Sequence, residues 1–195
     1  ETPAVEEVIR DRRVAAVSFT GSTRGGQAVA AIAASEIKPC VLELGGSDPA
    51  IVLADADLDR ASEILVKSRT IATGQSCIAP KRMLVEAPVY DAFLEKMKAR
   101  LGALKVGDPA DAATDVGPMA RADLRAEVHR QVSESVAKGA RAILGGELPD
   151  GPGSLYPITL LADVTPEMAA FREEVFGPVA SVTKVADAEE AIQMA

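Results

Sequence analysis

The feature of this sequence that most limits its fold is a regular alternation of short apolar runs with longer segments of helical periodicity. Residues 14–19 are apolar, a turn containing Gly21 follows, and residues 23–35 form an alanine-rich stretch of helical pattern. A strand that passes through a glycine turn into a helix is typical of α/β chains. The alternation therefore predicts an α/β fold with parallel strand pairing.

The alternation continues to the end of the chain. Further strands are predicted at residues 40–44, 50–53, 82–86, 141–144, 156–161 and 179–185. Further helices are predicted over residues 57–71 with Asp57 as N-cap, from Pro88 onward, over residues 121–138, and from Asp187 onward. Residues 145–153, rich in glycine and proline, are predicted to be a loop. One face of the helix near Pro88 is expected to be buried, and it carries Val89, Phe93, Met97 and Leu101.

The charge and hydropathy of the chain argue against two classes of partner. Twenty-one basic residues against 29 acidic ones give a net charge of -8, with no cluster of lysine or arginine to bind nucleic acid. No apolar stretch approaches the roughly 18 residues that span a bilayer, and the first residues lack the pattern of a signal peptide. We therefore expect a cytoplasmic globular protein with neither a nucleic-acid nor a membrane partner.

Cys77 is the candidate nucleophile. It follows Gly74-Gln75-Ser76 where a predicted helix gives way to a loop, whereas Cys40 lies in a predicted strand and is expected to be buried and slow to react. Two cysteines are too few for a disulfide framework or a zinc site, so no metal is expected. A thiolate attacks carbonyl carbon readily, but most free cysteines are buried apolar residues, and from the residue alone both interpretations stay open.

Glu43 is the candidate base. It ends a predicted strand and is followed by Leu44-Gly45-Gly46, where the absence of side chains allows the backbone to approach a ligand closely. A carboxylate there could activate the water that releases a thioester, although a glutamate at a strand end is usually a solvated charge. His129, the only histidine, lies in a charged helical pattern and is expected to be solvated, so neither a Cys-His nor a Ser-His-Asp mechanism is expected.

Two further segments have the residue types of a nucleotide site. Phe19-Thr20-Gly21-Ser22 places a glycine turn before a helix, where free N–H groups can hold a phosphate, but it lacks the common G-x-G-x-x-G spacing and could serve only as a turn. Glu173-Glu174-Val175-Phe176-Gly177-Pro178 combines carboxylates with an aromatic ring, which could clasp a ribose and pack on a ring, or form an ordinary surface loop.

Four segments together are specific. Phe19-Thr20-Gly21-Ser22, Leu42-Glu43-Leu44-Gly45-Gly46, Gly74-Gln75-Ser76-Cys77 and Glu174-Val175-Phe176-Gly177-Pro178, in this order and at these separations, resemble the aldehyde dehydrogenase superfamily over residues 14–195. Within that family, the segment 43–49 looks most like the succinate-semialdehyde dehydrogenase branch, since many other members have lysine where Ser47 stands.

The resemblance implies an NAD(P)-dependent oxidoreductase. Cys77 would attack the aldehyde to form a thiohemiacetal, a hydride would pass to NAD or NADP, and Glu43 would activate the water that hydrolyses the thioester. The backbone N–H of Cys77 would help to hold the substrate oxygen. The cofactor would be contacted by five residues: Gly21 and Ser22 near the pyrophosphate, Gly46 giving it room, Glu174 on the nicotinamide ribose and Phe176 beside the nicotinamide.

The resemblance also implies a division into domains. Residues 1–43 would be the last strand-helix-strand part of the Rossmann-like NAD(P)-binding domain, and residues 44–195 the catalytic domain with its sheet and flanking helices, truncated at its C-terminus. The full-length protein would be a homo-oligomer, a dimer or a tetramer. Family members hold the oxyanion and the adenosine ribose with residues that precede the matched region, so we expect a piece of a longer polypeptide.

Two alternatives stay open. The chain could be a non-catalytic folded fragment, inactive without the missing cofactor-binding segments. It could also belong to a CoA-acylating aldehyde dehydrogenase, in which CoA rather than water releases the thioester. The presence of Glu43 argues against the second alternative, because that chemistry needs no hydrolytic base.

Overall fold

The computed structural model describes residues 2–149 and 153–195. The chain divides into two compact units, Glu1–Gly46 and Ser47–Ala195. Of the predicted loop at residues 145–153, residues 150–152 lie outside the described part of the chain. Among the described residues, no helix combines the length and the apolar character needed to cross a membrane.

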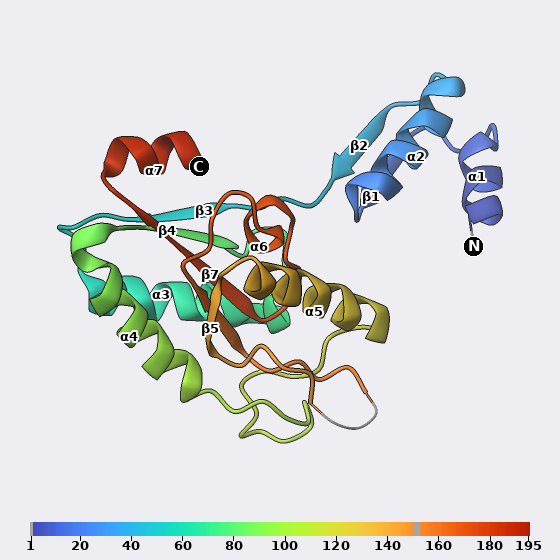
Figure 1. Ribbon diagram of the computed structural model, residues 1–195. Helices are drawn as coiled ribbons and strands as arrows, with labels where there is room; N and C mark the ends of the chain where they lie inside the picture. The colour runs from blue at the N-terminus through green and yellow to red at the C-terminus, as the bar shows by residue number, and fades with distance from the viewer. Residues whose placement is uncertain (1, 150–152) are drawn as a thin grey trace. The chain divides into compact units, whose positions relative to one another are not determined.

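The first unit pairs two parallel strands through a crossover helix (Figure 1). Its elements are α1 (Thr2–Arg10), β1 (Val17–Thr20), α2 (Thr23–Ser35) and β2 (Cys40–Glu43). The strand register runs from Val17 opposite Cys40 to Thr20 opposite Glu43, so both strands end at the same edge. Val29 and Ala33 of α2 pack with Ile9 of α1 to form the buried core of this unit.

The second unit contains a five-stranded sheet in the order β3-β4-β7-β6-β5. The strands are β3 (Pro49–Val52), β4 (Arg82–Glu86), β5 (Arg141–Leu144), β6 (Thr159–Ala162) and β7 (Val179–Val185). Three of the four pairings are parallel, but β5 and β6 pair antiparallel, so the expectation of parallel pairing is wrong at this edge. The described part of the connection between β5 and β6 contains no helix, and a parallel pair requires a long crossover.

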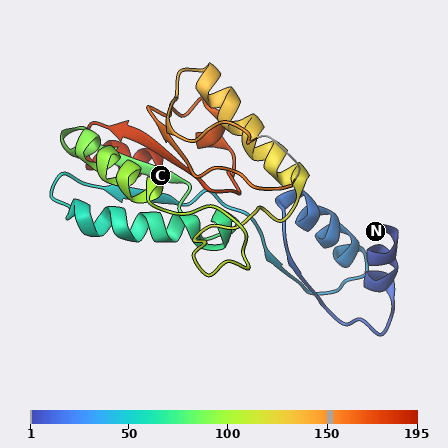
Figure 2. The same cartoon turned by 90° about the horizontal axis from the view of Figure 1, so that it is seen from below.

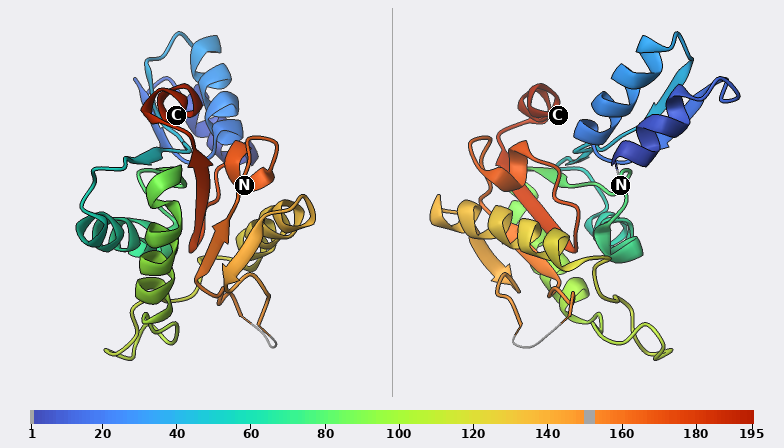
Figure 3. Two further views of the ribbon diagram at one scale, coloured as in Figure 1. Left: turned by 60° about the vertical axis from the view of Figure 1, so that its left-hand side comes forward. Right: turned by 90° about the vertical axis from the view of Figure 1, so that its right-hand side faces the viewer.

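Helices cover both faces of this sheet, as Figures 2 and 3 show for the second unit. The helices are α3 (Leu58–Thr70), α4 (Tyr90–Gly102), α5 (Ala122–Ala137), α6 (Ala169–Arg172) and α7 (Ala188–Met194), with short 3-10 helices η1 (Ile71–Gly74) and η2 (Ala87–Val89). Side chains alternate across a strand. Met83 and Val85 of β4 therefore pack with α3 and α4, while Leu84 packs with α5 and α6.

Most predicted helices and strands are confirmed, including Asp57 as the N-cap of α3, whose carboxylate accepts hydrogen bonds from two backbone N–H groups. Phe93, Met97 and Leu101 are fully buried as expected, and Val89 is half-buried at the start of the same turn. The short helices α1 and α6 were not predicted. α6 has only four residues, too few to show a helical period in the sequence.

Met97→Ala is expected to lower the free energy of unfolding of the chain by about 2–5 kcal/mol, because it opens a cavity in the core between α4 and the sheet. Lys98→Ala, the exposed neighbour on the same helix, is the matched control and should change it by no more than about 0.5 kcal/mol. Urea unfolding followed by circular dichroism measures both. Equal effects of the two substitutions would contradict the assignment of this face to the core.

Candidate active site

The loop that carries Cys77 begins with a strained turn after α3. Ala72, Thr73 and Gly74 have φ angles of 50°, 60° and 72°, all in the left-handed region. Such a conformation is costly for alanine and still more so for β-branched threonine, and it persists only where neighbouring groups hold it. From this turn the chain passes through Cys77, which is exposed, before it enters β4.

Backbone contact joins the turn to the segment 173–178, which carries Glu174 and Phe176 and leads into β7. A Cβ atom on Gly74 would overlap the carbonyl oxygen of Gly177. A Cβ atom on Gly177 would in turn meet Val128 of α5 at 2.9 Å. Glycine is therefore required at both positions for the space, and at Gly74 also for its positive φ angle.

Arg69, near the end of α3, forms hydrogen bonds that hold these two loops together. Its guanidinium is fully buried and donates hydrogen bonds to four backbone carbonyls: Val179 at 2.5 Å, Val175 at 2.6 Å, Gly177 at 2.6 Å and Gly74 at 3.2 Å. Burial lowers the pKa of Arg69 to about 10, which still leaves it positively charged near neutral pH. One cation therefore satisfies carbonyl groups from both loops and from β7.

Lys81, four residues after Cys77, is a second buried cation. Its Nζ donates to the carbonyl oxygens of Ser76 at 2.9 Å and Cys77 at 2.6 Å. The same atom lies 3.4 Å from Oε1 of Glu174. Burial lowers the pKa of Lys81, and the Glu174 carboxylate acts in the opposite direction. Lys81 thus contacts both the backbone that carries the thiol and the carboxylate of the neighbouring loop.

Two glutamine side chains complete the anchoring. Gln75, two residues before Cys77, accepts a hydrogen bond from the backbone N–H of Ala120 at 2.9 Å. Gln131 of α5 donates to the Glu173 carboxylate at 3.0 Å and to the Glu174 carbonyl at 3.2 Å. Each loop is therefore fixed to the body of the second unit as well as to the other loop.

The second unit brings together three of the predicted site residues. Cys77 is exposed on one loop, while Glu174 and Phe176 are half-buried on the other. Oε1 of Glu174 is itself buried and accepts no hydrogen bond from any described residue. The side chain is 27% exposed, so the other oxygen of the carboxylate could accept a hydrogen bond from a hydroxyl group of a bound molecule.

The first unit brings together Gly21, Ser22 and Glu43, at the edge where β1 and β2 end. The backbone N–H of Gly21 donates to the carbonyl of Glu43 at 3.0 Å, and the Glu43 side chain is exposed. Ser22 caps α2 by accepting a hydrogen bond from the N–H of Gly25 at 3.2 Å. Gly46 is the last residue of this unit, and its role stays a prediction, as does the approach of Glu43 to Cys77 in the other unit.

Close packing against Phe19 explains why glycines occupy this turn, whether or not a phosphate binds there. A Cβ atom on Gly21 would lie 2.7 Å from the ring of Phe19, and one on Gly25 would lie 2.8 Å from it. The backbone N–H groups of Thr23 and Arg24, by contrast, donate to no acceptor among the described residues. The first turn of α2 therefore keeps free donors even though the N–H of Gly21 is already paired.

Two expectations about the burial of side chains are wrong. Cys40 is half-buried rather than buried, because it lies in an outer strand of the small first unit and packs only at the margin of its core. His129 is half-buried rather than solvated, because Tyr156 packs beside it, with 3.4 Å between its Nδ1 and the tyrosine hydroxyl. His129 also lies 3.3 Å from the hydroxyl of Ser133, and among the described residues no contact joins it to Cys77.

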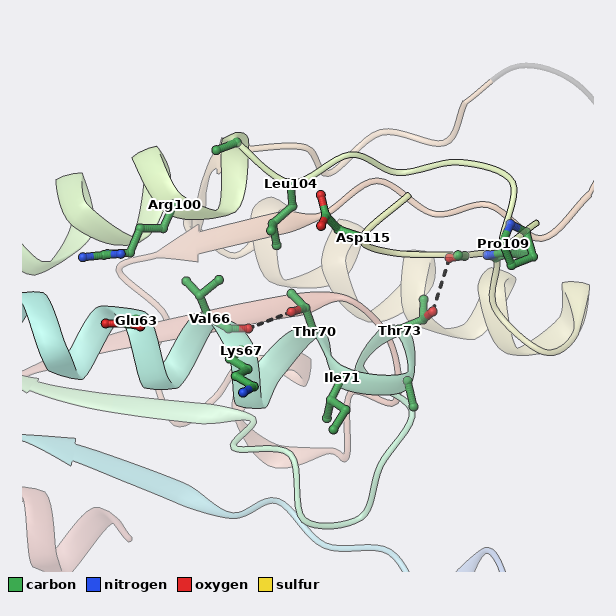
Figure 4. Close-up of a pocket in the computed structure, with 14 residues that line it drawn as sticks. Glu63, Val66, Lys67, Thr70, Ile71, Thr73, Arg100, Leu104, Pro109 and Asp115 are labelled. Atoms are coloured by element: carbon green, nitrogen blue, oxygen red, sulfur yellow. Dashed lines mark hydrogen bonds between the residues drawn. The ribbon is translucent and has the colours of Figure 1, made fainter. Parts of the chain in front are cut away.

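A cavity of about 850 Å³ lies next to the strained turn, between α3, the end of α4 and residues 109–118 (Figure 4). Thr73 lines this cavity and donates to the Gly117 carbonyl at 3.3 Å (Figure 4). Cys77 does not line this cavity, so the cavity does not mark the position of the candidate active site. Nor do the described residues include any group of three or more His, Cys, Asp or Glu side chains that could hold a metal ion.

Arg69, Lys81 and Gln131 were missed by the sequence analysis. Arg69 lies in the last turn of a predicted helix and Lys81 just before a strand, both positions where basic residues are normally solvated. Each contacts backbone atoms, which have no sequence signature. Only the tertiary structure shows that they are buried.

The second unit is a parallel-dominated α/β sheet in which a strained loop that carries a thiol is tied to a loop that carries a carboxylate. The model of the aldehyde dehydrogenase family matches residues 1–195, and the chain belongs to this family. This confirms the resemblance inferred from the four segments.

The chain is similar to several succinate-semialdehyde dehydrogenases. It is 55% identical over 192 residues to the NADP(+) enzyme of Mycolicibacterium paratuberculosis, covering 98% of this chain and 41% of that protein. It is 53% identical over 195 residues to the NAD(P)+ enzyme Sad of Escherichia coli, covering 100% of this chain and 42% of that protein. The chain thus spans about two fifths of the length of these relatives.

Solved structures confirm the fold class. The succinate-semialdehyde dehydrogenase from Burkholderia pseudomallei matches with a TM-score of 0.95 at 36% identity, covering 98% of this chain and 40% of that chain. A 3,6-anhydro-L-galactose dehydrogenase in complex with NAP matches with a TM-score of 0.93 at 38% identity, covering 97% of this chain and 41% of that chain.

Gly74→Ala is expected to destabilise the chain more than Gly139→Ala. Both glycines have positive φ angles, but a Cβ atom on Gly139 meets nothing within 4 Å, whereas one on Gly74 overlaps Gly177. Gly139→Ala should cost about 1–3 kcal/mol from backbone strain alone, and Gly74→Ala should cost more. Urea unfolding compares them, and a smaller loss for Gly74→Ala would contradict the close contact of the two loops.

Proposed function

We propose that the full-length protein containing this chain oxidises an aldehyde to the carboxylic acid with NAD or NADP, the substrate being succinate semialdehyde or a similar semialdehyde. The observation that carries the proposal is the exposed Cys77 on a loop fastened to the Glu174 loop, in a chain of the aldehyde dehydrogenase family. The names of the relatives support both the substrate class and the two cofactors.

The Glu174 carboxylate suits the ribose of a dinucleotide. Its Oε1 faces the Lys81 ammonium at 3.4 Å, and the side chain is 27% exposed, so a ribose hydroxyl could donate to its other oxygen. Phe176 would pack beside the nicotinamide, and the free N–H groups after Gly21 and Ser22 would receive the pyrophosphate, with Gly46 leaving room for the cofactor. When bound, NAD or NADP supplies the acceptor of the hydride.

The residues of this chain would carry the covalent steps. The thiolate of Cys77 forms a bond to the aldehyde carbon, and the carbonyl oxygen becomes the thiohemiacetal oxygen, held by the N–H of Cys77. Loss of a hydride oxidises this adduct to a thioester. Glu43 then takes a proton from water, the water oxygen attacks the thioester carbon, and the carbon–sulfur bond breaks to release the acid and the thiol.

The division of labour between the units is part of the proposal. Residues 1–43 would complete the NAD(P)-binding domain, and residues 44–195 would form the catalytic domain; the break between the compact units follows Gly46, three residues after this boundary. We also expect the full-length protein to be a cytoplasmic homo-oligomer, a dimer or a tetramer. The 195-residue chain by itself should be inactive, since it spans about two fifths of the relatives.

Cys77→Ala in the full-length protein should lower the rate of aldehyde oxidation by at least about a thousandfold, because no other nucleophile replaces the thiol. Cys40→Ala is the matched control and should keep the parental rate. NAD(P)H formation with succinate semialdehyde measures both. A Cys77→Ala variant as fast as its parent would sink the proposal.

Glu43→Gln should slow steady-state turnover by about a hundredfold while leaving a rapid burst of NAD(P)H, because hydrolysis needs the base and hydride transfer does not. Mass spectrometry of the protein after the burst should show an acyl group on Cys77. Loss of the burst itself would contradict the role of Glu43. Formation of acyl-CoA when CoA is added to the parent would favour the CoA-acylating alternative instead.

A further inference from the structure

Lys81 occupies a position that the proposed reaction does not yet explain. Its side chain is 0% exposed, and its three ammonium donors face the carbonyls of Ser76 and Cys77 and the carboxylate of Glu174. Burying an amine is costly unless it is paired, and uncharged side chains could fill the same space. Packing alone therefore does not account for a lysine at this position.

The contact with Ser76 determines the direction of a catalytic donor. The Ser76 carbonyl and the Cys77 N–H belong to one peptide group, and a trans peptide points these two groups in opposite directions. Because Lys81 and the Ala79 N–H both bind the Ser76 oxygen, the Cys77 N–H points away from them. Within the described residues this N–H donates to no acceptor, which leaves it free for a substrate oxygen.

The contact with Glu174 links this donor to the cofactor side of the site. Oε1 of Glu174 lies 3.4 Å from the Lys81 ammonium and accepts no hydrogen bond from the described residues. The Glu174 side chain is 27% exposed, so its other oxygen can reach a ligand while Oε1 faces the lysine. The same ammonium therefore restrains both the Cys77 peptide and the Glu174 carboxylate.

We propose that Lys81 is a positioning residue that aims the Cys77 N–H at the substrate oxygen and holds Glu174 for the cofactor ribose. This rests on the proposed function, because the two groups need a common orientation only if aldehyde and dinucleotide bind together. Arg69 differs from it in kind. All four of its hydrogen bonds go to carbonyls of residues other than Ser76 and Cys77, so it supports the loops without setting the peptide plane.

The test compares Lys81→Met with the parent in the full-length protein. Methionine keeps the length and removes the donors, so we expect kcat to fall about ten- to a hundredfold, with KM for the aldehyde changed less than about threefold. The dissociation constant for NADP, measured by fluorescence without aldehyde, should rise several-fold. The alkylation rate of Cys77 by iodoacetamide should also change. Lys98→Met, at an exposed position, is the control and should leave all four values unchanged.

A double-variant cycle separates positioning from mere support of the fold. Lys81→Met and Glu174→Gln should weaken NADP binding less than additively when combined, because both act through one contact. Additive effects, or a Lys81→Met protein with parental kcat and NADP affinity, would overturn the proposal. If circular dichroism shows that Lys81→Met is unfolded, Lys81→Gln takes its place with the same expected outcomes.

The failure of the two proposals can be told apart. A parent without Cys77-dependent aldehyde oxidation would refute the proposed function, and Lys81 would then be judged on NADP affinity and Cys77 alkylation alone. An active parent whose Lys81→Met variant is equally active would refute the role of Lys81 only. A drop in thermal stability with unchanged kinetic values would show that Lys81 serves the fold rather than the site.

Discussion

The guanidinium of Arg69 lies where helix α3, the turn at Gly74 and the start of β7 meet, and it donates to the carbonyls of Gly74, Gly177 and Val179. Without it, several buried carbonyl groups would lose their partners in a place that water does not reach, which is among the costlier defects a protein can have. The planar fork of arginine suits this task, since it presents five donors in a fixed geometry. The two loops of the candidate site take their positions from this cation.

The loop that carries Cys77 contains a strained turn, and side-chain contacts hold this turn in place. Ala72 and Thr73 adopt left-handed conformations that neither residue prefers, and the surrounding contacts of Arg69, Gln75 and Lys81 hold the loop in that form. In the proposed reaction, a loop held in this way would present Cys77 in one orientation before the aldehyde binds, so less entropy would be lost when the reacting groups meet. The cost of the strained turn is thus offset by the rigidity it gives the site.

Much of the fold could be predicted from the sequence, because it depends on local patterns. The strand at β4 and the helix at α2 have the predicted bounds, since an apolar run and a helical period each identify themselves over a few residues. The antiparallel β5 could not be predicted, since strand direction follows from how the chain returns rather than from the strand itself. In the site, Cys77 and the Glu174 loop were predicted separately, but nothing in the sequence indicated that Lys81 connects them.

The sequence by itself determined most of the strands and helices in their order, the membership of the aldehyde dehydrogenase family, and the candidate thiol and carboxylates. Periodicity and motifs are properties of residues near one another in the sequence, so they can be recognised without the folded structure. Only the tertiary structure decided which loops meet, and that Arg69 and Lys81 are buried between them. Arg69 binds the Val179 carbonyl across 110 residues of sequence, and a contact between a side chain and a distant backbone oxygen depends on the folded path of the chain rather than on the identity of the residue that supplies the oxygen.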